Sequence, residues 1–150
     1  MGLTDYSKAY GRNGAITDDT QMVLFTAEGL ILSKVRQEYE GDKGVISAGY
    51  HAFLRWLYTQ ETTLQDNLIQ NHGTCSIVDG VLTGHKELFS LRAPGNSCLS
   101  SLKSGKMGTV GDPINKSKGC GGVMRMAPAS GTCIILDRCF EDLPDQTEQV

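Results

Sequence analysis

Several features that mark specialised classes of protein are missing from this 150-residue sequence. The five cysteines are odd in number and include no CxxC pair, which argues against structural zinc and against a disulfide framework. No apolar run approaches the length of a membrane span. The first residues lack the basic and apolar regions of a secretory signal, and Tyr6 stands where myristoylation requires Ser or Thr. These absences predict a soluble, cytoplasmic protein with reduced thiols and no membrane partner.

A strong charge of one sign is also missing. The chain has a net charge of -3, and the excess of acidic residues lies in the last stretch, 137–150. The remainder is close to neutral, so the sequence gives no reason to expect a nucleic-acid partner. With 39% hydrophobic and 21% charged residues, and with no internal repeat, the composition is that of a single globular domain.

Helical periodicity dominates the first half of the chain. A helix is predicted from about Asp18 to Arg36, with Thr17 or Asp18 as the N-cap and a capping box between Asp18 and Gln21. Gly29 inside this helix predicts a close contact with a second helix. The apolar residues are spread widely enough for a buried helix: Met22, Leu24, Phe25, Ala27, Leu30, Ile31 and Val35.

The clearest amphipathic helix is predicted over residues 47–60. Its apolar stripe has helical spacing, with Arg55 and Gln60 turned away from it and His51 and Trp56 beside it. His51 is interpreted as a surface or packing residue. The stripe consists of Tyr50, Phe53, Leu54, Leu57 and Tyr58.

The second half of the chain is richer in turn residues. Residues 61–89 predict a loop with short helical turns, in which His72 and His85 are structural. A short helix is predicted over 97–103, with Asn96 as the N-cap and Gly105 just beyond its end. A glycine-rich loop follows over 105–122, and another helix opens at 123–127. The pattern as a whole predicts an all-α fold.

Two carboxylates and two hydroxyls gather at the start of the first predicted helix. One reading is structural, because acidic side chains in a first turn complement the helix dipole and cap free amides. The other is a site for a hard cation, since oxygen ligands without nearby His or Cys suit magnesium. The residues alone leave both readings open.

The glycine-rich loop also has two readings. It is either a plain flexible connection or an anion cradle, in which glycines let backbone N–H groups approach a phosphate. It is not a P-loop, because Gly105-Lys106 is followed by Met107. Basic residues outnumber acidic ones here: Lys103, Lys106, Lys116, Lys118 and Arg125 against Asp112.

Three motifs in order resemble those of the ADP-ribosylglycohydrolase family. They are Ile16-Thr-Asp-Asp-Thr-Gln-Met22, Arg92-Ala-Pro-Gly-Asn-Ser-Cys-Leu-Ser100 and Ser117-Lys-Gly-Cys-Gly-Gly-Val-Met-Arg-Met-Ala-Pro128. The resemblance covers about residues 10–128. It implies an all-α, orthogonal multi-helix bundle and a magnesium-dependent hydrolase that releases ADP-ribose from a protein side chain or a small molecule.

The resemblance also implies roles for individual residues. Thr17, Asp18 and Asp19 correspond to ligands of a two-magnesium site, and the two carboxylates are the catalytic candidates. The second and third motifs would hold ADP-ribose, free or attached to a protein. The ligand-binding candidates are Asn96, Ser97, Gly119, Cys120, Gly121, Gly122, Val123, Met124 and Arg125.

The sequence departs from the family pattern in three places. The family's late Asp-x-Asp-Thr motif and its glycine-rich opening segment are missing, and residues 129–150 form a divergent tail. We therefore expect one truncated, partial domain over 1–150 with at most half of the magnesium site, whose exposed apolar faces would favour self-association. The alternatives are an inactive fragment that at most binds ADP-ribose, and a helical interaction module.

Overall fold

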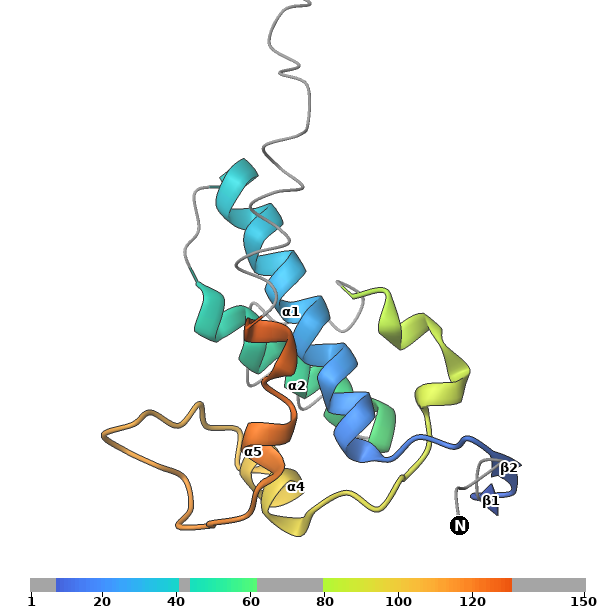
Figure 1. Ribbon diagram of the computed structural model, residues 1–150. Helices are drawn as coiled ribbons and strands as arrows, with labels where there is room; N and C mark the ends of the chain where they lie inside the picture. Colours follow the sequence, from blue (N-terminus) through green and yellow to red (C-terminus); the bar gives the residue numbers. More distant parts are fainter. Residues whose placement is uncertain (1–7, 41–43, 62–79, 131–150) are drawn as a thin grey trace, which may run out of the picture.

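The computed structural model describes residues 8–40, 44–61 and 80–130, and it is predominantly helical as predicted (Figure 1). Two short antiparallel strands, β1 (Lys8–Ala9) and β2 (Arg12–Asn13), precede the helices, with Lys8 opposite Asn13. The helical elements are α1 (Asp18–Glu40), α2 (Val45–Gln60), the 3-10 turns η3 (Leu82–Gly84) and η4 (Lys86–Leu88), α4 (Asn96–Lys103) and α5 (Gly121–Met124). No helix in these ranges is both long and apolar enough to span a membrane.

Helices α1 and α2 pack closely at Gly29, which confirms the predicted contact. A Cβ atom at Gly29 would lie 2.9 Å from Ala52 Cβ and 3.1 Å from the carbonyl oxygen of Ala48. The absence of a side chain at this position therefore lets the two helix backbones approach. This contact fixes where α2 crosses α1.

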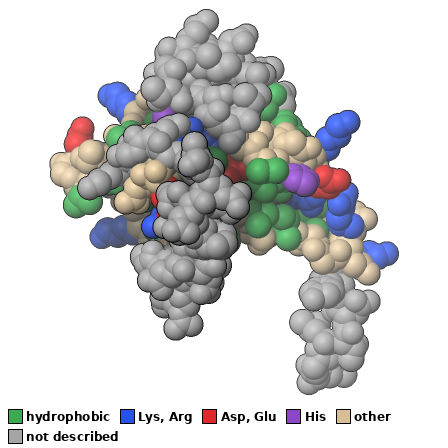
Figure 2. All heavy atoms as spheres, turned by 90° about the horizontal axis from the view of Figure 1, so that it is seen from above, with side chains coloured by type: hydrophobic (Ala, Val, Ile, Leu, Met, Phe, Trp, Pro, Cys, Tyr) green, Lys and Arg blue, Asp and Glu red, His purple; other side chains and the backbone are tan. Residues whose placement is uncertain are grey.

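The core lies between α1 and α2 and extends to η4 and α4. Its fully buried members include Met22 and Phe25 from α1 and Trp56 from α2. The expectation that α1 is buried all round was wrong: Leu24, Ile31 and Val35 are 38–50% exposed, because α2 covers the opposite face. Hydrophobic side chains also reach the surface on the face drawn in Figure 2.

Arg55 is buried, although the sequence pattern predicted that it turns away from the core. Its side chain is 3% exposed, and its Nε lies 3.0 Å from Glu28 Oε2. The backbone N–H of Leu82 donates to the other carboxylate oxygen of Glu28 at 2.9 Å. The reason for the wrong prediction is this long-range partner, which lets the guanidinium enter the interior. The pair ties α1, α2 and η3 together.

Gln21 forms a buried polar network in place of the predicted capping box. Its amide donates to the carbonyl oxygens of Leu88 and Ser90 at 3.3 and 3.2 Å, and its Oε1 accepts from Trp56 Nε1 at 3.3 Å. The N–H of Asp18, which a capping box would use, donates instead to the carbonyl oxygen of Arg92 at 2.9 Å. The capping-box prediction was therefore wrong. Gln21 connects α1 to the segment that leads into the second motif.

Several boundaries differ slightly from the prediction. Helix α4 begins at Asn96 itself, so Gly95 and not Asn96 is its N-cap. Gly105 has φ +69° and follows the C-cap, as predicted. The last predicted helix starts two residues earlier, at Gly121, and is interrupted by a turn at 125–126 before residues 127–130 become helical again.

Two of the three histidines lie in the described part of the chain, and their surroundings differ. His51 is 9% exposed, so it is a packing residue and not a surface one, and its ring lies 6.2 Å from that of Tyr50. His85 is exposed between the two 3-10 turns. His72 lies outside the described residues.

Candidate active site

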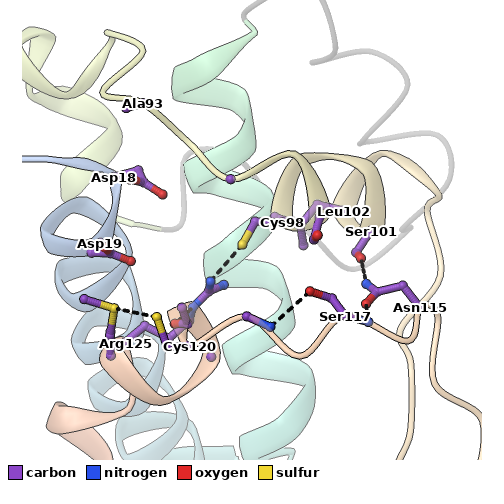
Figure 3. A pocket seen from close by; sticks show the side chains of 16 residues that line it. Asp18, Asp19, Ala93, Cys98, Ser101, Leu102, Asn115, Ser117, Cys120 and Arg125 are labelled. Atoms are coloured by element: carbon purple, nitrogen blue, oxygen red, sulfur yellow. Dashed lines mark hydrogen bonds between the residues drawn. The ribbon is translucent and has the colours of Figure 1, made fainter.

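One cavity of about 500 Å³ is enclosed by three segments that are far apart in the sequence (Figure 3). The start of α1 forms one wall, the segment from Ala93 through α4 forms the second, and the loop that leads into α5 forms the third. The lining residues are Asp18, Asp19, Ala93, Gly95, Ser97, Cys98, Ser101, Leu102, Asn115, Ser117, Gly119, Cys120, Gly121, Gly122, Met124 and Arg125. Each of the three motifs therefore contributes to a single site.

The two carboxylates lie at the start of α1 and line the cavity. Asp18 is 8% exposed and Asp19 is half-buried. A Cβ atom added to Gly121 would lie 3.9 Å from Asp19 Oδ1, which places this carboxylate beside the third motif. Among the described residues, no hydrogen bond or ion pair engages either carboxylate. Both are thus available to a ligand.

The donor chemistry at this position suits magnesium. Proteins usually bind Mg²⁺ through one or two carboxylates, and water and substrate oxygens complete the coordination shell of the ion. Thr17 is exposed and does not line the cavity, although it directly precedes Asp18. Within the described ranges, no group of three or more His, Cys, Asp and Glu side chains is arranged to hold a metal. The carboxylate pair could supply oxygen ligands to a bound cation from one side only.

Arg125 lines the third wall of the cavity, near Asp19 (Figure 3). Its Nε donates to the carbonyl oxygen of Gly121 at 2.7 Å, and its Nη2 donates to Cys98 Sγ at 2.8 Å. Its guanidinium also lies over the ring of Phe53, 5.6 Å from the centroid. These contacts fasten the first turn of α5 to α4 and α2 and hold a positive charge at the cavity.

The other basic residues of this region lie elsewhere. Among the described Lys and Arg side chains, Arg125 alone lines the cavity, while Lys103, Lys106, Lys116 and Lys118 are exposed outside it. Lys103 pairs with Glu61. Figure 2 likewise shows basic side chains distributed around the edge of the molecule and not gathered in one patch. The cavity lining thus holds fewer basic side chains than the sequence of this region suggested.

The structure brings most of the predicted site residues together. Asp18, Asp19 and Ser97 line the cavity, as do the predicted third-motif residues Gly119, Cys120, Gly121, Gly122, Met124 and Arg125. Thr17, Asn96 and Val123 do not, and Val123 is 80% exposed. The side chain of Val123 points away because α5 is a single turn whose other face lines the cavity.

Several lining residues were not among the predicted site residues. Ala93, Gly95, Cys98 and Ser117 lie within the second and third motifs but were not singled out, whereas Ser101, Leu102 and Asn115 lie outside the motifs. Ser101 follows Ser97 by one helical turn, so the spacing along α4 could have identified it. No local spacing could have identified Asn115, because it reaches the cavity only where the loop folds back onto α4.

One of three comparisons with known proteins gives a match. The family model described as ADP-ribosylglycohydrolase matches residues 1–143, which extends beyond the motifs at both ends. No match was found among curated proteins or among solved structures. The matched region contains all three walls of the cavity. The chain therefore belongs to the ADP-ribosylglycohydrolase family.

Proposed function

We propose that this protein is a magnesium-dependent hydrolase that cleaves the glycosidic bond between ADP-ribose and a protein side chain or small molecule. The observation that carries the proposal is the cavity itself, in which two carboxylates face a glycine-rich loop and an arginine. Its volume of about 500 Å³ lies in the range of pockets that enclose a small molecule. Hydrolysis of a glycosidic bond needs a carboxylate beside the anomeric carbon, and the start of α1 supplies two.

The two sides of the cavity suit different parts of ADP-ribose. The side formed by Gly119, Gly121 and Arg125 would take the diphosphate, because glycines expose backbone N–H groups and the guanidinium is permanently charged. The ribose whose bond is cleaved would lie next to the diphosphate, against the start of α1. This orientation puts the scissile bond next to Asp18 and Asp19.

Magnesium would be held at the Asp18–Asp19 pair, with one carboxylate as a ligand and Thr17 directly before it in the chain. A divalent cation there would orient the ribose hydroxyls and neutralise charge that develops as the glycosidic bond breaks. The other carboxylate would accept a proton from the attacking water while the bond between the anomeric carbon and the departing group breaks, and it would return that proton to the departing group. An adjacent pair of carboxylates can serve both needs.

Conservative substitution of each carboxylate tests this proposal. Asp18→Asn and Asp19→Asn should each slow the release of ADP-ribose at least roughly 100-fold, the usual contribution of a general acid or base. Asp112→Asn is the matched control, since Asp112 is exposed and lies outside the cavity. Circular dichroism should show unchanged helix content in all three variants. Full activity in both cavity variants would sink the proposal.

Magnesium dependence needs its own measurement. Calorimetry of ADP-ribose binding, with magnesium and with a chelator, should show tighter binding in the presence of magnesium. Equal binding in both buffers would place the affinity in the glycine-rich loop and would contradict a metal role for the carboxylates.

A second candidate function is ADP-ribose binding without turnover. The observation that favours it is the donor set, because the described residues supply two carboxylates and no larger metal-ligating group. A divalent cation held from one side keeps most of its water and is weakly bound. Binding of ADP-ribose without product release at saturating magnesium would support this function over the first.

A further inference from the structure

A chain of hydrogen bonds fastens the glycine-rich loop to α4, and Asn115 stands at its centre (Figure 3). Asn115 Nδ2 donates to Ser101 Oγ at 2.6 Å, and Asn115 Oδ1 accepts from the backbone N–H of Ser117 at 2.8 Å. Ser117 Oγ in turn accepts from the N–H of Gly119 at 3.3 Å. All four residues line the cavity. One side chain therefore links α4 to the backbone of the third motif.

The residue before Asn115 anchors the loop on its other side. Ile114 lines an apolar cleft of about 360 Å³ between α2 and α4, together with Phe53 and Met107. A Cβ atom at Gly108 would lie 2.9 Å from Ile114 Cγ1, so the two arms of the loop are in contact here. Ile114 and Asn115 thus form an apolar and a polar anchor in consecutive positions.

The other contacts of the loop lie before Asn115: a local turn joins Thr109 and Asp112, and Met107 borders the apolar cleft. Residues 103–120 are all exposed, and the loop contains several glycines. Exposed, glycine-rich backbone loses much conformational entropy when a ligand orders it, and that loss weakens binding. Hydrogen bonds that order the backbone before the ligand arrives reduce this cost. Asn115 accepts one such hydrogen bond from the N–H of Ser117. It thereby also positions Ser117 Oγ, which accepts a second hydrogen bond from the N–H of Gly119.

We propose that Asn115 is a positioning residue that pre-orders the backbone of residues 117–121 for the diphosphate of ADP-ribose. The inference rests on the proposed function for the identity of the ligand. It assigns to Asn115 an effect on affinity and not on the chemical step, because the side chain acts through the loop and lies at the end of the cavity away from Asp18 and Asp19 (Figure 3).

Substitution of Asn115 tests the effect on affinity. Asn115→Ala should raise the Kd for ADP-ribose and the KM of the reaction about threefold to tenfold, the loss expected for one or two hydrogen bonds, with kcat unchanged. Asn115→Ser should recover part of the affinity, since a serine hydroxyl can accept the same N–H more weakly. Ser101→Ala should share the loss, and the double variant Ser101→Ala/Asn115→Ala should be less than additive.

Ser130→Ala is the matched control for Ser101→Ala. Ser130 is exposed, lies outside the cavity and the three motifs, and donates a local hydrogen bond to the carbonyl oxygen of Ala127. Its substitution should leave Kd, KM and kcat unchanged.

Limited digestion with trypsin reports the order of the loop without any ligand. Lys116 and Lys118 lie inside the anchored stretch, whereas Lys106 precedes it and serves as an internal control. Asn115→Ala should speed cleavage after Lys116 and Lys118 relative to cleavage after Lys106. A residue that only touched the ligand would not change this ratio.

The outcomes separate the inference from the proposed function. If the unchanged protein binds ADP-ribose but Asn115→Ala leaves Kd, KM and the cleavage ratio unaltered, the positioning role is overturned and the proposed function stands. A fall in kcat with constant KM would overturn it too. If the unchanged protein binds no ADP-ribose, the proposed function fails, and the ligand assigned to this loop fails with it.

Discussion

The backbone N–H of Asp18 donates a 2.9 Å hydrogen bond to the carbonyl oxygen of Arg92. Asp18 begins α1 and belongs to the first motif, while Arg92 begins the second. Arg92 is itself buried, with its Nε on Ser90 Oγ at 2.8 Å and its guanidinium 4.8 Å from the ring centroid of Tyr10. The first two motifs are therefore joined through the backbone, and the position of the candidate catalytic carboxylates depends on the segment around Arg92.

Gln21 joins the same two segments through its hydrogen bonds to Leu88, Ser90 and Trp56. Its loss should therefore destabilise the protein. Gln21→Leu leaves two carbonyl oxygens and the indole N–H of Trp56 without their partner, and each such group costs about 1–3 kcal/mol. The free energy of unfolding should fall by at least about 2 kcal/mol. Trp56 is the single tryptophan in the sequence, so its fluorescence during urea unfolding measures the change directly. Gln37→Leu, at an exposed position on the same helix, is the matched control.

Replacement of Gly29 by alanine should also destabilise the fold. The added methyl group would meet Ala52 Cβ at 2.9 Å and force the two helices apart, at a cost of about 1–3 kcal/mol less the roughly 1 kcal/mol gained in helix propensity. Gly49→Ala on α2 is the contrasting control, since nothing lies within 4 Å of its Cβ. Thermal unfolding should show a lower Tm for Gly29→Ala and an equal or higher Tm for Gly49→Ala. Equal behaviour of the two variants would contradict the close contact.

The buried pair of Arg55 and Glu28 gives a third prediction. Arg55→Met leaves the Glu28 carboxylate buried and unpaired, which should lower the free energy of unfolding by about 3–5 kcal/mol. The double variant Glu28→Met/Arg55→Met should recover a large part of this loss, because no buried charge is left. Lys103→Met, in the exposed pair with Glu61, should change stability by no more than about 0.5 kcal/mol. Chemical denaturation of all three variants would measure these differences.

Gly121→Ala should impair ligand binding more than stability. Its Cβ would lie 3.0 Å from Arg125 Nη2, the end of a flexible side chain that can move aside within the cavity. We expect the Kd for ADP-ribose to rise about tenfold, equivalent to about 1.4 kcal/mol, with little change in Tm. Gly111→Ala is the control, since Gly111 lies outside the cavity and nothing is within 4 Å of its Cβ. Unchanged affinity in Gly121→Ala would argue against a role for this wall.

ADP-ribose itself should stabilise the protein against heat. A ligand that binds only the folded state adds about 2.7 kcal/mol at a concentration of 100 times its Kd. Thermal unfolding with and without ADP-ribose, both in magnesium, therefore measures binding without requiring turnover. AMP serves as a smaller comparison ligand. No change in Tm with ADP-ribose would favour a helical interaction module that takes no such ligand.

The sequence predicted a helix or a contact correctly where that feature follows from a single local pattern. The amphipathic spacing placed α2 to within two residues, and Gly105 ends the fourth helix with a positive φ as its position indicated. Gly29 correctly predicted the contact between α1 and α2. A glycine destabilises the interior of a helix, and close packing against a second helix offsets that destabilisation. These features depend on neighbours in the sequence or on a single residue type, which is why the sequence reveals them.

The features that the sequence did not reveal depend on distant partners. Arg55 looked like a solvent-exposed residue because its partner Glu28 lies on another helix. Gln21 looked like a capping residue, but Trp56, Leu88 and Ser90 engage its side chain instead. The motifs identified the two carboxylates of the candidate site and most of the residues of the third motif that line it. Asn115 and Ser101 meet only because the loop returns onto α4, and no local pattern encodes that return.

The turn at residues 109–112 has a practical consequence. The N–H of Thr109 donates to the carbonyl oxygen of Asp112, the N–H of Asp112 donates to Thr109 Oγ1, and Val110 between them is fully exposed. Exposed loop tips of this kind tolerate insertions well. A short affinity tag or a fluorophore attached at Val110 would leave both the core and the cavity untouched. The same position would let the protein be immobilised on a surface with its cavity open to solution.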